Sequence, residues 1–230
     1  MVEATAASPR LPAPGPRLKV CGLREPGQAR AVAALGVDAL GVIAVAASPR
    51  YVAPQDRPPL FAAMAGAAPA CLGVLVVADP PDAELDLLVG GHGHGVVQLH
   101  GRESVERCRE LRQRLGLPVW KAVRVRSPDD LEAALAYAPV VDALLLDAWV
   151  EDQLGGTGHR IPVEWLDGFR PPLPWWLAGG ITPERLGAVL DRLQPDGVDV
   201  SSGVEDAPGR KNLDRVAALV AARDQAALGT

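Results

Sequence analysis

Two side chains that can exchange protons stand at the ends of short apolar runs. Cys21 ends the run Leu18-Lys19-Val20-Cys21 and is followed by Gly22, and Asp147 follows the apolar residues 143–146. A cysteine is reactive as its thiolate, and a carboxyl group can act as a general acid or base. An aspartate in such a place can equally cap a helix. Which role applies depends on where the fold places each run.

Glycines follow two further apolar runs near the C-terminus. Gly179 and Gly180 come after Leu177-Ala178, and Ser201, Ser202 and Gly203 come after Asp199-Val200. Glycine lets backbone N–H groups approach anionic oxygens, and the start of a following helix adds positive potential. We therefore expect these two segments to bind a phosphate, although they could also be simple tight turns.

The elements that must position these residues alternate regularly along the chain. Short apolar runs, expected as strands, begin near Leu18, Ala39, Cys71, Gly95, Val119, Ala143, Trp175 and Gly197. Helices are expected between them, over 26–35, 55–65, 82–89, 104–116, 128–137, 183–193 and 212–222, with a short, weakly marked one at 163–168. Several begin with a capping residue and proline, as in Ser127-Pro128 and Thr182-Pro183.

Alternating strands and helices predict parallel strands joined by right-handed crossovers. Eight such units match a single-domain α/β fold, the (β/α)8 or TIM barrel. A doubly wound open sheet is the alternative, but no strand leads through a GxGxxG segment into a helix. The barrel is therefore the predicted fold.

A barrel sorts the candidate residues, because its active site lies at the C-terminal ends of the strands. Cys21, Asp147 and His100 end predicted strands, whereas Cys71 begins one and Cys108 lies within a helix. His92 and His94 precede a strand, so a metal site joining them to His100 would span the barrel, and we reject it. Only Cys21 among the cysteines is placed for chemistry.

Composition narrows the function class. The chain has 230 residues with 23 basic and 28 acidic side chains, a net charge of −5, which argues against a nucleic-acid-binding surface. No run of about 18 apolar residues is present, which excludes a membrane span. Three cysteines without a CxxC pair suggest a reducing, cytoplasmic location. We expect residues 1–16, rich in alanine and proline, to be a flexible extension, and 17–230 to be the barrel.

Eight segments in order resemble one family. They are Lys19-Val20-Cys21-Gly22-Leu23, Ser48-Pro49-Arg50-Tyr51-Val52, Val97-Gln98-Leu99-His100-Gly101, Lys121-Ala122-Val123-Arg124-Val125, Leu145-Leu146-Asp147, Gly155-Gly156-Thr157-Gly158, Leu177-Ala178-Gly179-Gly180 and Val198-Asp199-Val200-Ser201-Ser202-Gly203-Val204-Glu205. Together they resemble phosphoribosylanthranilate isomerases, from Leu18 to the final helix.

The resemblance implies an aldose–ketose isomerase of tryptophan biosynthesis that works without cofactor or metal. It would carry out the Amadori rearrangement of N-(5′-phosphoribosyl)anthranilate, with Cys21 as general base and Asp147 as general acid. Arg50, otherwise a solvated loop residue, would bind the anthranilate carboxylate. The other substrate-binding residues would be His100, Gly156, Gly179, Gly180, Asp199, Ser201, Ser202 and Gly203. The partner is a phosphorylated small molecule, and the protein is expected to be a monomer or homodimer.

These roles impose physical conditions. A free thiol has a pKa of about 8.5, so Cys21 needs a local field that favours the thiolate. An aspartate carboxyl group has a pKa of about 3.9 in water, so the pKa of Asp147 must be raised for it to act as an acid. Lys19 shares a strand face with Cys21 and points into the barrel. A buried lysine needs a carboxylate partner, and we expect this to be Asp199.

Two departures from the family leave details open. His159 stands where the family usually has lysine, and residues 42–45 lack the usual aromatic side chain. Trp149 could stack on the anthranilate ring, whereas Trp165, Trp175 and Trp176 are expected to pack in the core. Alternatives are a sister barrel, either indole-glycerol-phosphate synthase or a histidine-pathway aminoaldose isomerase, and a phosphate-binding barrel without catalysis.

Overall fold

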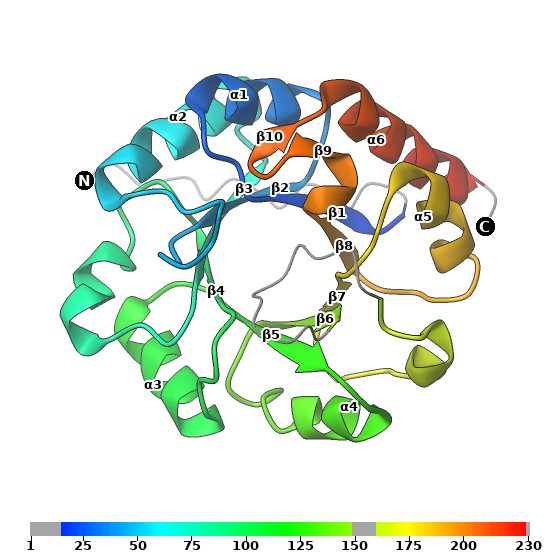
Figure 1. Ribbon diagram of the computed structural model, residues 1–230. Coiled ribbons are helices and arrows are strands. Elements are labelled where there is room, and N and C mark those ends of the chain that lie inside the picture. Colours follow the sequence, from blue (N-terminus) through cyan, green and yellow to red (C-terminus); the bar gives the residue numbers. More distant parts are fainter. Residues whose placement is uncertain (1–14, 149–159, 229–230) are drawn as a thin grey trace, which may run out of the picture.

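Eight parallel strands close into a barrel, with helices around its outside (Figure 1). The computed structural model describes residues 15–148 and 160–228. The strands are β1 (Arg17–Cys21), β2 (Ala39–Ile43), β3 (Leu72–Val77), β4 (Val96–Leu99), β5 (Val119–Val125), β6 (Ala143–Ala148), β7 (Trp175–Leu177) and β8 (Gly197–Val200). Each pairs with the next, and β1 pairs with β8 through Lys19 and Asp199. The predicted (β/α)8 barrel is confirmed.

Four of the helices that the structure describes have proline in their first turn, where it is well tolerated. The helices are α1 (Pro26–Ala34), α2 (Arg57–Ala67), α3 (Val105–Leu115), α4 (Pro128–Leu135), α5 (Pro183–Leu190) and α6 (Leu213–Leu228). The Ser104 hydroxyl accepts a hydrogen bond from the Arg107 N–H and caps α3, which ends at Gly116 in the left-handed conformation.

Two predicted helices are wrong in type. The segment expected to form a helix over 82–89 is instead a 3₁₀ helix, Asp82–Leu87, and the short one expected over 163–168 is a 3₁₀ turn, Val163–Leu166. Pro80 and Pro81 precede the first of these and Gly90 and Gly91 follow it, so residues that disfavour a helix interior lie on both sides of the segment. Further 3₁₀ turns are Pro54–Asp56 and Ser202–Val204.

A small antiparallel hairpin follows β8 and was not predicted. Its strands are β9 (Glu205–Ala207) and β10 (Arg210–Lys211), and Figure 1 shows it between α1 and α6. Its sequence is mostly charged and carries no apolar alternation, which is the usual sign of a strand.

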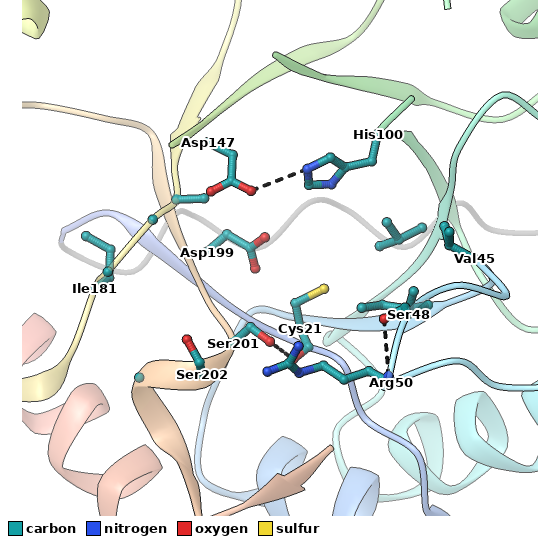
Figure 2. A pocket seen from close by; sticks show the side chains of 16 residues that line it. Cys21, Val45, Ser48, Arg50, His100, Asp147, Ile181, Asp199, Ser201 and Ser202 are labelled. Atoms are coloured by element: carbon teal, nitrogen blue, oxygen red, sulfur yellow. Dashed lines mark hydrogen bonds and ion pairs between the residues drawn. The ribbon is translucent and has the colours of Figure 1, made fainter. Parts of the chain in front are cut away.

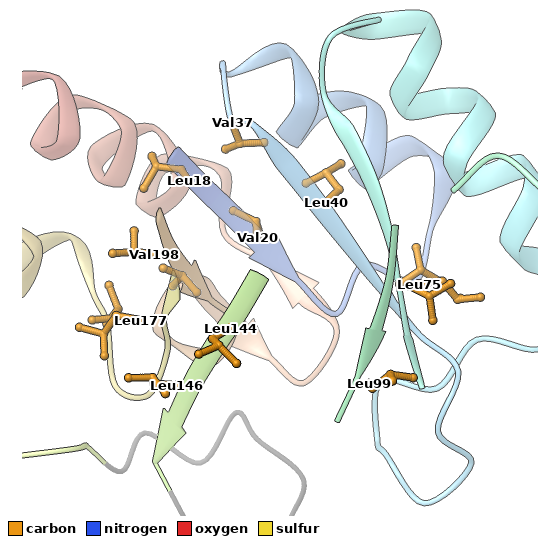
Figure 3. Packing of buried hydrophobic residues seen from close by; sticks show 14 of the residues in the cluster. Leu18, Val20, Val37, Leu40, Leu75, Leu99, Leu144, Leu146, Leu177 and Val198 are labelled. Carbon is orange, nitrogen blue, oxygen red and sulfur yellow. The ribbon is translucent and has the colours of Figure 1, made fainter. Parts of the chain in front are cut away.

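The core has two layers because strand side chains alternate between the two faces of the barrel wall. Outward-facing apolar residues pack under the helices; they include Leu18, Val20, Leu40, Leu144, Leu146 and Val198 (Figure 3). Inside the barrel a second cluster includes Val74, Val96, Leu145 and the contacting rings of Trp120 and Trp176, whose centroids are 4.8 Å apart. The barrel interior is therefore packed, and the polar side chains gather at one end.

Candidate active site

A pocket opens at the C-terminal ends of the strands, where barrel enzymes carry their active sites (Figure 2). Its empty volume is about 710 Å³, which includes space open to solvent. The sequence-predicted residues that line it are Cys21, Arg50, His100, Asp147, Gly179, Gly180, Asp199, Ser201, Ser202 and Gly203. Gly156, also predicted, lies outside the described residues, as do Trp149 and His159.

Strand alternation explains why these side chains meet. In β6 the outward residues Leu144 and Leu146 lie in the layer beneath the helices, so Leu145 and Asp147 face inward. The same parity turns Lys19 and Cys21 inward from β1, and Asp199 from β8. Each polar residue is the last or nearly the last inward position of its strand, which places it at the rim of the apolar interior.

Asp147 faces His100 across the pocket rim. The carboxylate Oδ2 of Asp147 lies 3.3 Å from Nε2 of His100, and both residues are buried. The other ring nitrogen, Nδ1, lies 3.2 Å from the amide nitrogen of the fully buried Gln98. Nε2 faces the carboxylate but makes no hydrogen bond among the described residues.

Lys19 and Asp199 form the predicted ion pair. Lys19 Nζ donates to Oδ2 of Asp199 at 2.8 Å, and Lys19 is fully buried. The other carboxylate oxygen of Asp199 has no hydrogen-bond partner among the described residues. Figure 2 shows Asp199 between Asp147 and Cys21, with its carboxylate at the pocket. Burial alone would lower the pKa of Lys19, but the charges of Asp199 and Cys21 raise it, so the ammonium persists.

Cys21 is held in the thiol form when the pocket is empty. Burial raises the pKa of Cys21 above its ordinary value. The charges of Lys19 and Lys211 oppose that effect, and the charge of Asp199 adds to it. The expected field favouring the thiolate is thus present but is outweighed by desolvation in the empty site.

Arg50 is held in place by a carboxylate that sequence reasoning missed. Its guanidinium meets Glu205 through two nitrogens, with Nη2 2.6 Å from Oε2 and Nε 2.9 Å from Oε1. The hydrogen bonds that Arg50 donates to Glu205 raise the pKa of Arg50 further despite partial burial. Such a bidentate pair fixes the plane of the guanidinium at the pocket wall.

Lys211 is the second functional candidate that sequence reasoning missed. Its buried ammonium donates to the backbone carbonyl of Cys21, to Oε1 of Glu205 at 2.6 Å and to the carbonyl of Ser201 at 3.3 Å. Both Glu205 and Lys211 belong to the hairpin after β8. Glu205 stood within a family-like segment, but nothing in the sequence assigned a role to either residue.

The two glycine segments lie against each other. A Cβ on Gly203 would lie 1.9 Å from the carbonyl oxygen of Ile181, so only glycine allows the loop after β8 to approach the loop after β7 so closely. Gly179 and Gly180 both have positive φ, at 90° and 61°, a conformation that glycine adopts without strain. Their close packing forms one concave wall of the pocket with Ser201 and Ser202.

An apolar wall completes the pocket. It is formed by Ile43, Val45, Val76, Ala178 and Ile181. Ile43 and Val45 belong to the segment that lacks the family's usual aromatic residue, so aliphatic side chains take its place there. Trp175 and Trp176 are buried in the core and Trp165 packs against it, as predicted.

The remaining histidines and cysteines lie elsewhere. His92 and His94 stack with ring centroids 6.3 Å apart and contact the carbonyls of Asp86 and Leu88. Burial raises the pKa of Cys71 to about 12 and that of Cys108 to about 11, so both are unreactive thiols. Among the described residues, no group of three or more His, Cys, Asp or Glu side chains could hold a metal ion.

Comparison with known proteins gives a consistent family. The family model for N-(5′-phosphoribosyl)anthranilate (PRA) isomerase matches residues 18–222. An N-(5′-phosphoribosyl)anthranilate isomerase from Synechocystis is 45% identical over 213 residues, covering 92% of this chain and 97% of that protein.

Solved structures agree with this. Phosphoribosyl anthranilate isomerase from Thermotoga maritima has a TM-score of 0.80 and 30% identity, covering 94% of this chain and all of the other. An isomerase complex with reduced 1-(o-carboxyphenylamino)-1-deoxyribulose 5-phosphate has a TM-score of 0.74 and 31% identity, over 91% and 98% of the two chains. The chain therefore belongs to the N-(5′-phosphoribosyl)anthranilate isomerase family.

Proposed function

We propose that this protein converts N-(5′-phosphoribosyl)anthranilate to 1-(2-carboxyphenylamino)-1-deoxyribulose 5-phosphate in tryptophan biosynthesis. The observation that carries the proposal is one pocket that contains a buried thiol, a buried carboxyl group, an arginine and two contacting glycine loops. An aminoaldose becomes an aminoketose by moving protons, which requires one acid and one base. Membership of the family supplies the substrate.

Asp147 is the proposed general acid. It protonates the ribose ring oxygen while the C1′–O bond breaks, and the anthranilate nitrogen then forms a Schiff base with C1′. His100 lies 3.3 Å from the carboxylate and fixes its orientation. After the transfer, Asp147 is a carboxylate that faces the His100 ring nitrogen at this distance.

Cys21 is the proposed general base. Its thiolate removes the proton from C2′, and the electron pair of that C–H bond moves toward C1′ to give an enaminol. Tautomerisation of the enaminol places a proton on C1′ and the carbonyl at C2′. Since burial favours the protonated thiol, the thiolate must form against that effect through the cations beside it.

Recognition of the two ends of the substrate follows the pocket walls. A planar guanidinium fork suits a carboxylate, and Arg50 lines the same pocket as the apolar side chains Ile43 and Val45, against which an anthranilate ring would pack. The loops with Gly179, Gly180, Ser202 and Gly203 also line this pocket and suit a phosphate.

Other expectations remain predictions. We expect no cofactor or metal, a cytoplasmic location and a monomer or homodimer. In the part of the chain that the structure describes, no helix has the length and apolar character needed to cross a bilayer. Also within that part, the exposed large apolar side chains are Leu135, Leu213 and Leu228, on two different helices.

The test is turnover of substrate generated in situ, followed through the loss of its anthranilate fluorescence. We expect a rate proportional to enzyme concentration and a product of the same mass as the substrate that, after borohydride reduction, co-elutes with reduced 1-(o-carboxyphenylamino)-1-deoxyribulose 5-phosphate. A rate indistinguishable from that without enzyme would refute the proposed reaction, and binding of the product analogue without turnover would favour a non-catalytic barrel.

A further inference from the structure

Three cations and two carboxylates are linked around Cys21. Lys19 forms an ion pair with Asp199 at 2.8 Å, and Arg50 forms one with both carboxylate oxygens of Glu205. Among the described residues, Lys211 forms an ion pair only with Glu205, which Arg50 already engages. The cluster therefore carries one more positive than negative charge while Cys21 is a thiol, and its charges balance when Cys21 is a thiolate.

The hairpin directs Lys211 toward Cys21. The side-chain amide of Gln28 on α1 bonds both the N–H and the carbonyl of Lys211, at 3.2 and 3.1 Å. The N–H of Gly209 donates to Glu205 at 3.0 Å within the turn. With its backbone held in this way, Lys211 is 3% exposed, and its ammonium meets the carbonyl of Cys21.

Burying a charge costs free energy, and holding a backbone carbonyl in place does not require a charged donor. A neutral donor could hold the carbonyls of Cys21 and Ser201, whereas an ammonium must be desolvated to reach them. Burial indeed lowers the pKa of Lys211, which Glu205 and Cys21 partly restore. The positive charge is therefore the property of Lys211 that needs a functional reason.

We propose that Lys211 is a positioning residue for the general base: its ammonium holds the backbone of Cys21 and supplies the excess positive charge that a Cys21 thiolate balances. The proposal rests on the role of Cys21 proposed above. The other charged or titratable groups around the thiol are Lys19 on β1, Asp199 on β8, Glu205 on β9, Arg50 after β2, and, across the pocket, Asp147 and His100.

The first test is the rate at which iodoacetamide alkylates Cys21 as a function of pH, measured by mass spectrometry of its peptide. Cys71 and Cys108, with pKa values of about 12 and 11, stay protonated over most of the range. Lys211→Gln keeps a donor but loses the charge, and Lys211→Arg keeps the charge. The control is Arg210→Gln, which removes an exposed charge from the same strand.

We expect Lys211→Gln to slow alkylation about tenfold at a fixed pH below the thiol's titration midpoint, and Lys211→Arg and Arg210→Gln to stay within about twofold of the parent. A parent-like profile for Lys211→Gln would overturn the proposal, because a donor without charge would then suffice.

A second measurement does not depend on that variant folding. The chain has only three lysines, Lys19, Lys121 and Lys211, so their side-chain Cε signals can be resolved by NMR, with Lys211→Arg providing the assignment. Coupling is reciprocal, so the Lys211 signal should shift at the pH where Cys21 ionises and lose that shift in Cys21→Ser.

An unchanged Lys211 titration in Cys21→Ser would refute the coupling. Failure of the role proposed for Cys21 is distinguishable, because it would appear as full turnover by Cys21→Ser, and failure of the proposed reaction would appear as no turnover by the parent, whatever the alkylation profile and the lysine signals show.

Discussion

Contacts with neighbouring side chains fix the positions of the functional groups in the pocket. Arg50 meets Glu205 through a bidentate contact, Asp147 faces a histidine oriented by Gln98, and Lys19 pairs with Asp199. Sequence reasoning found Cys21 and Asp147 because they end strands, and Arg50 only through the family resemblance. It missed Glu205 and Lys211, because charged residues in a short segment with glycine and proline look like a solvated loop.

Replacing Arg50 by lysine keeps the charge but removes the planar fork. We expect Arg50→Lys to raise KM for the substrate about tenfold or more and to change kcat much less, because the carboxylate lies away from the reacting carbons. Steady-state kinetics measure this. A KM equal to that of the parent would show that Arg50 does not bind the carboxylate.

Gly41 leaves room for the Cys21 thiol. A Cβ at this position on β2 would lie 2.6 Å from Sγ, so Gly41→Ala must displace the thiol. We expect kcat to fall about tenfold or more, since small displacements of a catalytic group are costly. Gly66→Ala on α2, where a Cβ meets nothing within 4 Å, is the matched control and should retain kcat. Equal rates for both variants would contradict this account.

At the scale of elements, the strands were predictable and the connections less so. The expected strand starts fall within one residue of the observed ones, because buried parallel strands are continuous apolar runs. The segment over 82–89 formed a 3₁₀ helix rather than an α-helix, a difference that its apolar pattern does not reveal. The hairpin β9–β10 was missed because tertiary contacts with α1 and Arg50 hold it, and these leave no local pattern.

The contact between the two glycine loops makes a prediction at this scale. Gly203→Ala would place a methyl group on the carbonyl of Ile181, so one loop must move. We expect the affinity for inorganic phosphate and for the product analogue to fall about tenfold or more, measured by calorimetry.

Gly187→Ala on α5 provides the control, since a Cβ there meets nothing within 4 Å. It should keep both affinities and gain up to about 1 kcal/mol of stability from its higher helix propensity. If Gly203→Ala also bound phosphate like the parent, the loops after β7 and β8 would not form the phosphate site.

At the scale of the whole molecule, residues that affect stability and residues proposed for catalysis lie at different ends of the barrel strands. Cys71 stands at the start of β3, away from the pocket. Burial, and to a smaller extent the charge of Asp38, raises its pKa in the native protein from the ordinary value of 9.0 to about 12. Between these pH values the native protein keeps a proton that the unfolded chain loses. The free energy of unfolding must therefore fall as pH rises, by about 1.4 kcal/mol per pH unit for this thiol.

Replacing this thiol isolates its contribution. Urea unfolding of the parent and Cys71→Ala at pH 8, 9.5 and 10.5 should show a shallower alkaline loss in the variant. Below pH 9.0 the two curves should run parallel, because the thiol is then protonated in both states. Parallel curves throughout would mean that Cys71 ionises in the native protein as freely as in the unfolded chain.

The central claim is that Cys21 and Asp147 move the protons of the isomerisation. The most direct measurement compares single-turnover rates of the parent, Cys21→Ser and Asp147→Asn, together with the affinity of each for the reduced product analogue. We predict rates lower by about 10²–10⁴-fold in both variants, with the affinity nearly unchanged. Parent-like rates in either variant, with the analogue still bound, would contradict the account.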